Sequence, residues 1–121
     1  MDIYARNILD HYQRPRHRGV LPEADASFAA LNRSCGDEMT VYVKLKDGVI
    51  SAISFEGQGC AVSVAAMSIL SETLVGYRPE DVAKLGLAEL QPLLGIDISP
   101  RREKCALIGL RALQGALGFS V

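Results

Sequence analysis

Between residues 27 and 55, hydrophobic and polar positions alternate, which is the pattern of extended strands buried on one face. Val41, Val43 and Leu45 alternate with polar residues, and Asp47-Gly48 follows directly. An Asp-Gly pair between two alternating runs predicts a tight hairpin turn. Residues 27–32 add an earlier strand, so the pattern predicts a three-stranded antiparallel sheet with one face to be covered.

The segments on either side of this region have helical patterns. Residues 2–13 predict a short amphipathic helix that ends before Pro15, and residues 61–75 predict a helix that stops at Gly76. Short helices are predicted from Pro79 and over residues 88–94, and Ser99-Pro100 predicts the start of a long helix reaching about residue 117. The fold class is therefore α+β, with the sheet packed against several helices in one domain over residues 1–121.

Composition places the chain among ordinary globular proteins. Its 121 residues are 49% hydrophobic and 22% charged. A chain of this length and composition can bury a core without stabilising disulfides or metals. The net charge of −1 gives no electrostatic reason to expect nucleic acid or an anionic membrane as a partner. No apolar run approaches the roughly 20 residues that span a bilayer, and no signal region begins the chain. We therefore expect a cytoplasmic protein.

Three cysteines are the main candidates for chemistry. Cys35, Cys60 and Cys105 are separated by 25 and 45 residues, and no C-x-x-C pair is present. An odd number of widely spaced cysteines argues against a disulfide framework, so we expect reduced thiols in a reducing compartment.

The segment Cys35-Gly36-Asp37 joins two predicted strands. Its glycine lets the backbone bend, so that a thiolate and a carboxylate two residues apart can face one centre. Asp37 and the three cysteines make four ligands, the number that a tetrahedral metal needs. Thiolates suit zinc, copper(I) or iron–sulfur clusters, and a Cys₃Asp set would hold a cluster less firmly than the usual Cys₄ set.

The other two cysteines are both placed where a thiolate is favoured. Cys60 directly precedes a predicted helix, whose backbone N–H groups and dipole lower a thiol pKa. Gly57 and Gly59 are expected to keep this joint open for a metal or a partner. Cys105 lies in the first turns of the last predicted helix with Arg101 and Lys104 beside it, and both cations favour its thiolate.

Simpler interpretations stay open for each of these features. A free cysteine is more often a small buried hydrophobe than a ligand, and the spacing alone does not select a metal site. His11 and His17 could be ligands, although a packed or surface His11 and a solvated His17 fit the pattern better. The basic turn over residues 14–19 reads as a solvated connector, with a docking patch for an acidic surface as the alternative.

Four segments nevertheless match a known family over nearly the whole chain. The chain resembles the IscU/SufU/NifU-N family of iron–sulfur cluster assembly proteins, with the three cysteine motifs in the right order. The matching segments are Asp10-His11-Tyr12 with Pro15-Arg16 and Gly19, Asn32-Arg33-Ser34-Cys35-Gly36-Asp37, Phe55-Glu56-Gly57-Gln58-Gly59-Cys60-Ala61 and Arg102-Glu103-Lys104-Cys105-Ala106-Leu107.

The resemblance implies a SufE/NifU-like fold and a scaffold on which sulfur from a cysteine desulfurase meets iron before the cluster passes to acceptor proteins. It implies that Cys35, Asp37, Cys60 and Cys105 bind the metal or a transient [2Fe-2S] cluster, with zinc common in the isolated protein. One cysteine receives persulfide, and Cys105 and Cys35 are the candidates, with Lys104 and Arg101 stabilising the thiolate. A monomer or weak oligomer is expected.

Two features distinguish the subfamilies that this sequence resembles. IscU-type members carry His before the third cysteine and a Leu-Pro-Pro-Val-Lys chaperone motif upstream, whereas this chain has Lys104 and the segment 96–101. Both features resemble SufU, although the insertion usual in SufU between the second and third cysteines is missing. Three hypotheses follow: an assembly scaffold and sulfur acceptor, a zinc-dependent sulfurtransferase that relays sulfur without building a cluster, and a structural zinc domain that mediates protein contacts.

Overall fold

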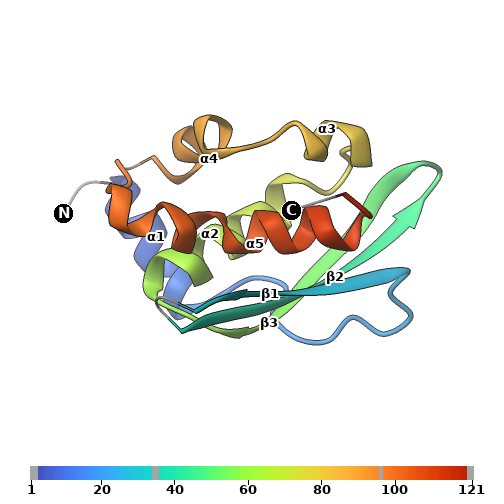
Figure 1. The fold of residues 1–121 in the computed structure, drawn as a ribbon, viewed down its shortest axis with the longest axis horizontal. Helices are drawn as coiled ribbons and strands as arrows, with labels where there is room; N and C mark the ends of the chain where they lie inside the picture. The colour runs from blue at the N-terminus through green and yellow to red at the C-terminus, as the bar shows by residue number, and fades with distance from the viewer. Residues whose placement is uncertain (1–2, 34–35, 96, 120–121) are drawn as a thin grey trace.

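A three-stranded antiparallel sheet forms one layer of the molecule, as the alternating pattern predicts. The computed structural model describes residues 3–33, 36–95 and 97–119. The strands β1 (Ala26–Asn32), β2 (Asp37–Lys46) and β3 (Val49–Gln58) are arranged in the order β1-β2-β3. β2 is thus the central strand, and β1 and β3 are the edges (Figure 1).

The predicted hairpin joins β2 and β3. Asp47 and Gly48 both have positive φ, at 55° and 80°. Two successive residues of this kind form the type of tight turn whose twist matches that of the flanking strands. The turn sets the register in which Val41 lies opposite Phe55 and Val43 opposite Ile53, with one irregularity between Lys44 and Leu45.

Five α-helices accompany the sheet within the described residues. Helices α2 and α5 lie over one face of the sheet, with α3 and α4 beyond them and α1 at the side of α2 (Figure 1). Their bounds are α1 (Ile3–Gln13), α2 (Ala61–Thr73), α3 (Pro79–Ala83), α4 (Leu87–Leu94) and α5 (Glu103–Ala116), with the 3₁₀ turn η1 (Pro100–Arg102) just before α5.

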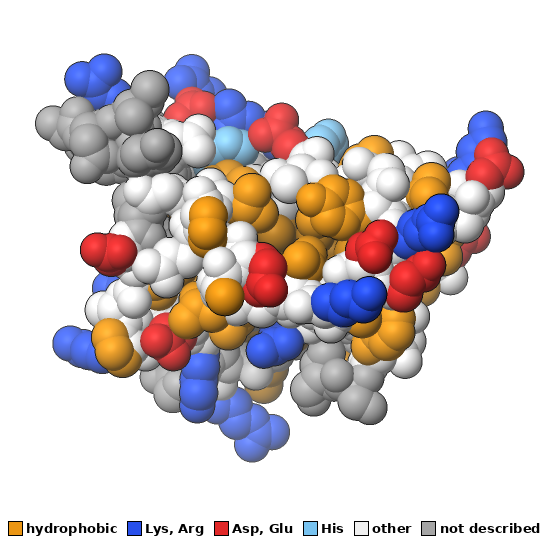
Figure 2. Space-filling view, turned by 90° about the horizontal axis from the view of Figure 1, so that it is seen from above, with side chains coloured by type: hydrophobic (Ala, Val, Ile, Leu, Met, Phe, Trp, Pro, Cys, Tyr) orange, Lys and Arg blue, Asp and Glu red, His pale blue; other side chains and the backbone are white. Residues whose placement is uncertain are grey.

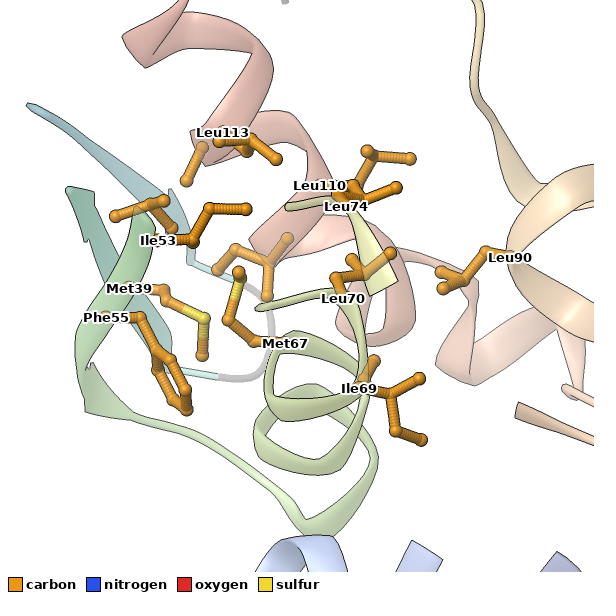
Figure 3. Packing of buried hydrophobic residues seen from close by; sticks show 14 of the residues in the cluster. Met39, Ile53, Phe55, Met67, Ile69, Leu70, Leu74, Leu90, Leu110 and Leu113 are labelled. Atoms are coloured by element: carbon orange, nitrogen blue, oxygen red, sulfur yellow. The ribbon is translucent and has the colours of Figure 1, made fainter. Parts of the chain in front are cut away.

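The core fills the space between the sheet and the two central helices. Met39, Ile53 and Phe55 project from the sheet toward α2, as Figure 3 shows. Gly109 lets α5 approach α2 closely, since a Cβ built there would lie 2.5 Å from the Met67 sulfur. Residues from the helices complete the buried cluster, among them Met67, Leu70, Leu74, Leu90, Leu110 and Leu113.

Two predicted helix ends differ from the structure. The last helix was expected to start at Ser99-Pro100, but these residues begin η1 and the α-helix begins only at Glu103. Short 3₁₀ turns are common at helix starts. α2 ends at Thr73, before the expected stop, because the chain turns to pair with β3: the Gly76 N–H donates to the Ile50 carbonyl and the Ile50 N–H to the Tyr77 carbonyl.

The basic turn over residues 14–19 is exposed at Arg14, His17 and Arg18, as expected of a solvated connector, but it is also bonded to its neighbours. Arg14 and Arg16 both pair with Asp10, at 2.8 and 2.5 Å. The Gly19 N–H donates to the Phe55 carbonyl, and the Phe55 N–H donates to the His17 carbonyl. The turn therefore covers part of the β3 edge, and much of its charge is already paired.

The surface has mixed character on the helical side. Figure 2 shows apolar side chains reaching the surface in the middle of this face, with cations and acids spread around them. No helix within the described residues is long and apolar enough to cross a membrane.

Candidate metal centre

Three elements that are distant in sequence meet at one end of the sheet. Asp37 is the first residue of β2, Cys60 is the N-cap of α2, and Cys105 lies in the first turn of α5. One carboxylate oxygen and the two sulfur atoms all lie within 4.8 Å of one another. The fold thus brings together three of the four predicted ligands, and the fourth, Cys35, falls outside the described residues.

Asp37 is a buried carboxyl group that is only half satisfied. The residue is 2% exposed, and its Oδ1 accepts a hydrogen bond from the Cys60 N–H at 3.2 Å. Its Oδ2 is buried and has no hydrogen-bond partner within the part of the chain that the structure describes. A buried acceptor of this kind costs about 1–3 kcal/mol, and more if it is charged. A cation beside Oδ2 would offset that cost.

Gly59 leaves the space that this carboxyl group occupies. A Cβ at Gly59 would lie 2.1 Å from the Ser63 hydroxyl and 3.0 Å from Asp37 Oδ1. Gly57 has φ of +134°, and a Cβ there would lie 2.2 Å from the Glu38 carbonyl of β2. The contacts that exclude a side chain at both glycines come from the chain itself, whereas the sequence suggested room for a metal or a partner.

The position of Cys60 at a helix start affects its thiol as predicted. Burial raises its pKa, and nearby Asp37 acts in the same direction. The backbone N–H and hydroxyl of Ser63, together with the Val62 N–H, outweigh both effects and hold the pKa below its ordinary value. Donors at a helix N-terminus stabilise the thiolate, which is the nucleophilic and metal-binding form.

Cys105 is a reduced thiol, 4% exposed, on the wall of a cavity of about 580 Å³. Arg101 belongs to η1 and not to α5, so it does not share a helix with Cys105 as the sequence predicted. It borders the cavity nevertheless. The full lining is Asn32, Cys60, Pro100, Arg101, Arg102, Glu103, Lys104 and Cys105.

The donor set fits a thiophilic metal ion. Zinc with Zn–S bonds of about 2.3 Å holds its tetrahedral donors about 3.8 Å apart, so donors within 4.8 Å need only a small movement to share one ion. Two thiols suit zinc or iron, and the Asp37 Oδ2 atom supplies a buried oxygen ligand. Both observations favour a bound cation.

The histidines lie elsewhere. His11 Nδ1 is 2.7 Å from the Ser68 hydroxyl, and His17 Nδ1 is 3.0 Å from the Ser71 hydroxyl. Within the described ranges, the only group of three or more potential ligands close enough to share an ion is Asp37, Cys60 and Cys105. Of the packed and surface positions expected for His11, the structure shows the packed one, and His17, although exposed, is hydrogen-bonded to α2.

Two residues at the site were not singled out in the sequence. Ser63 donates its hydroxyl to the Cys60 carbonyl at 2.9 Å and favours the Cys60 thiolate. Its place three residues after an N-cap was the available signal. Asn32 lines the cavity, and only its position in the segment matched to the family pointed to it.

Comparison with known proteins points to one family. The family model "NifU-like N terminal domain" matches residues 3–119. The chain is 32% identical to the iron–sulfur cluster assembly scaffold protein IscU of Thermotoga maritima, covering 95% of this chain and 92% of that one. It is 28% identical to the zinc-dependent sulfurtransferase SufU of Bacillus subtilis, covering 93% and 87%.

A solved structure shares the fold. A crystal structure described as an iron–sulfur cluster assembly scaffold protein for the SUF system of Fervidobacterium islandicum AW-1 aligns with a TM-score of 0.78. The match covers 97% of this chain and 96% of that one at 24% identity, which supports the fold alone.

Proposed function

This chain belongs to the family of NifU-like N-terminal domains, and we propose that it is an iron–sulfur cluster assembly scaffold and sulfur acceptor. The observation that supports this most directly is the convergence of Asp37, Cys60 and Cys105, with a buried carboxylate oxygen that has no hydrogen-bond partner among the described residues. An unpaired buried acid destabilises a structural core, whereas in a cation-binding site the bound cation pairs with it.

The ligand set of the proposal is Cys35, Asp37, Cys60 and Cys105. Zinc or iron would be held by the thiolates and the carboxylate, and a transient [2Fe-2S] cluster would be the cargo. When zinc is bound, it keeps the thiols deprotonated and ordered. A carboxylate is a harder ligand than a thiolate, so Asp37 is the ligand suited to exchange. An exchangeable ligand suits a cluster that has to be transferred.

Sulfur acceptance is a thiol–persulfide exchange. A thiolate of this site attacks the outer sulfur of a persulfide on the donor; a new S–S bond forms here as the donor's S–S bond breaks, and the donor cysteine leaves as a thiolate. The sulfane sulfur keeps its oxidation state, so no external oxidant or reductant is needed. Cys105 and Cys35 are the candidate acceptors, and Lys104 and Arg101 stabilise the attacking thiolate.

The partners follow from this chemistry. A cysteine desulfurase supplies the persulfide, and iron–sulfur acceptor proteins receive the cluster, in the cytoplasm. Lys104, which stands where IscU-type members carry histidine, makes the chain SufU-like at this position.

A second function is a zinc-dependent sulfurtransferase that relays sulfur without building a cluster. Lys104 favours it, and so does the likeness to the sulfurtransferase SufU of Bacillus subtilis. Anaerobic reconstitution with iron, cysteine and a desulfurase separates the two functions. A stable, visible-absorbing cluster on this protein supports the scaffold and excludes the pure relay.

Persulfide mapping by mass spectrometry tests sulfur acceptance itself. We expect persulfide on Cys105 or Cys35 after reaction with a desulfurase, and its loss when the acceptor is changed to serine. Cys60→Ser should weaken zinc binding by more than about 100-fold, since even outer-shell changes cost 10–100-fold. Asp81→Asn, which alters a carboxylate on α3, is the matched control and should bind zinc normally.

A purely structural zinc domain predicts a different outcome. In that case Cys60→Ser and Cys105→Ser would unfold the protein, and persulfide would never appear on the wild-type chain. Folded variants that no longer accept persulfide rule this possibility out.

A further inference from the structure

A groove runs between the edge strand β1 and helix α5, next to the metal centre. It encloses about 580 Å³. Ala30, Leu107 and Ile108 give it an apolar lining, and Arg33, Lys104 and Arg111 supply three cations. Asn32 and Lys104 line both this groove and the cavity that contains Cys60 and Cys105. The groove is therefore continuous with the thiol site.

The outer edge of β1 is open for strand pairing. The backbone N–H and carbonyl of Phe55 bond to residues 17 and 19, on the side of β3 that faces away from β2. Val41 lies opposite Phe55 on β2, so the backbone groups of Val41 point toward β1. Since Phe28 lies opposite Val41, the even-numbered residues of β1 pair with β2. The backbone groups of Ser27, Ala29 and Leu31 then point away from the sheet, and no backbone partner is found for them within the described chain.

The charge of the groove is uncompensated. None of the three cations forms an ion pair with a carboxylate among the described residues, although Arg111 donates a hydrogen bond to Gln114. Arg14 and Arg16 differ, because both pair with Asp10. Two copies of this chain joined edge to edge at β1 would bring like charges together. An anionic occupant is favoured instead.

We propose that this groove binds an extended acidic segment of a partner protein as a fourth strand along β1. Strand addition satisfies the outward backbone groups of β1, and alternate side chains of the added strand face the apolar lining and cations of α5. The seven residues of β1 can pair with a segment about 23 Å long, at about 3.3 Å per residue. The partner would thereby be held beside the thiols. Its role as sulfur donor or cluster acceptor rests on the proposed function, whereas the docking does not.

Fluorescence anisotropy with a labelled synthetic peptide tests the proposal on the full chain. The probe is a seven-residue peptide that alternates glutamate with valine, and the comparison peptides carry lysine or glutamine in place of glutamate. We expect the acidic peptide to bind at least about tenfold more tightly than either, and its affinity to fall with salt. Equal binding of the three peptides would overturn the proposal.

Charge reversal in the groove gives a second readout. Arg111→Glu and Arg33→Glu should each weaken binding of the acidic peptide by about fivefold or more, because an attraction becomes a repulsion. Lys84→Glu makes the same change at the end of α3 and should bind the peptide normally. Wild-type affinity in both groove variants would exclude this site.

Backbone pairing is tested separately, by amide hydrogen exchange. The Ala29 and Leu31 amides should become protected when the acidic peptide is added, and Ala29→Pro should abolish binding, because proline removes an outward N–H that β2 does not use. If the Ala29→Pro variant fails to fold, hydrogen exchange on the wild-type protein decides the test. Amides that stay unprotected when the peptide is added would contradict a partner strand. So would protection that appears without peptide as the protein dimerises. Zinc binding of the same samples reports on the metal centre independently.

Discussion

One buried polar cluster lies at the beginning of α2 and another in its second half, and they differ in how completely their polar atoms are paired. The thiol cluster consists of Asp37, Cys60 and Cys105. The serine–histidine cluster consists of His11 and Ser68, with His17 and Ser71 beside them. Both clusters join segments that are remote in sequence, yet only the thiol cluster keeps a carboxylate oxygen that has no partner among the described residues.

The serine–histidine cluster is a closed set of hydrogen bonds between α1, the basic turn and α2. Ser68 Oγ lies 2.7 Å from His11 Nδ1 and accepts the Arg16 N–H at 2.9 Å. The Ser71 hydroxyl donates to the Ser68 carbonyl at 2.7 Å. On the other side of the ring, His11 Nε2 faces Glu72 at 3.6 Å. Such a set fastens α1 and the turn to α2 and needs no further ligand.

The difference in pairing distinguishes polar groups whose hydrogen bonds stabilise the fold from a group whose oxygen is available to a ligand. Two other buried atoms lack partners in the described residues, Arg16 Nη1 and Ser54 Oγ. Arg16 keeps a strong contact to Asp10 through Nη2, and Ser54 is a neutral hydroxyl. Asp37 alone combines an acid, burial and neighbouring thiols. Incomplete pairing indicates function where the unpaired atom matches the chemistry around it.

The largest effect is expected from Ser68→Ala. Removing the hydroxyl leaves His11 Nδ1 and the Arg16 N–H unpaired in a buried place, so the free energy of unfolding should fall by about 2 kcal/mol. Chemical denaturation measures this, and zinc affinity should stay unchanged. Ser51→Ala, at an exposed serine of β3, is the control and should cost about 0.5 kcal/mol or less. Equal losses in the two variants would contradict a structural role for the cluster.

Asp37→Asn should have the opposite effect on stability. The amide keeps an oxygen for the Cys60 N–H but removes a poorly satisfied acid, so the metal-free protein should gain about 1 kcal/mol. Zinc affinity should fall by more than about tenfold.

Asp25→Asn is the matched control, because Asp25 also accepts one backbone N–H, that of Leu45, but is exposed. It should change neither stability nor zinc binding noticeably. A metal-free Asp37→Asn protein that is less stable than wild type would show that the carboxylate is a structural group.

The smallest effect concerns pH. Burial and the nearby Arg16 lower the pKa of His11 from its ordinary value of 6.5, outweighing Glu72 and Asp10, which raise it. The unfolded chain therefore binds more protons than the folded one just below pH 6.5. The stability contributed by neutral His11 is complete above that pH and declines as the pH falls below it.

Denaturation curves measured across this pH range test the sign of the effect. His11→Gln should flatten the decline, whereas His17→Gln should retain it. A decline that is the same in His11→Gln as in the wild type would mean that other groups cause it.

The regular elements could be read from local sequence because their signals are local. The alternation through Val41 and Val43 predicted β2, and Asp47-Gly48 predicted the hairpin. The start of α2 after Cys60 was predicted correctly, and so was the lowered pKa of its thiol. Errors arose where distant contacts decided the outcome. α2 ended early because residues 76–77 pair with β3. The basic turn is exposed as expected, but its pairing with Asp10 and β3 was not predicted.

The sequence by itself determined which residues could bind a metal and which elements would present them, since residue type, helix starts and turns are local properties. Tertiary structure decided that Asp37, Cys60 and Cys105 meet, because they lie on three elements that only packing brings to one end of the sheet. It also decided that Asp37 Oδ2 is buried with no partner in the described ranges and that three cations line the groove beside β1. Burial and pairing depend on the whole fold, and no local pattern encodes them.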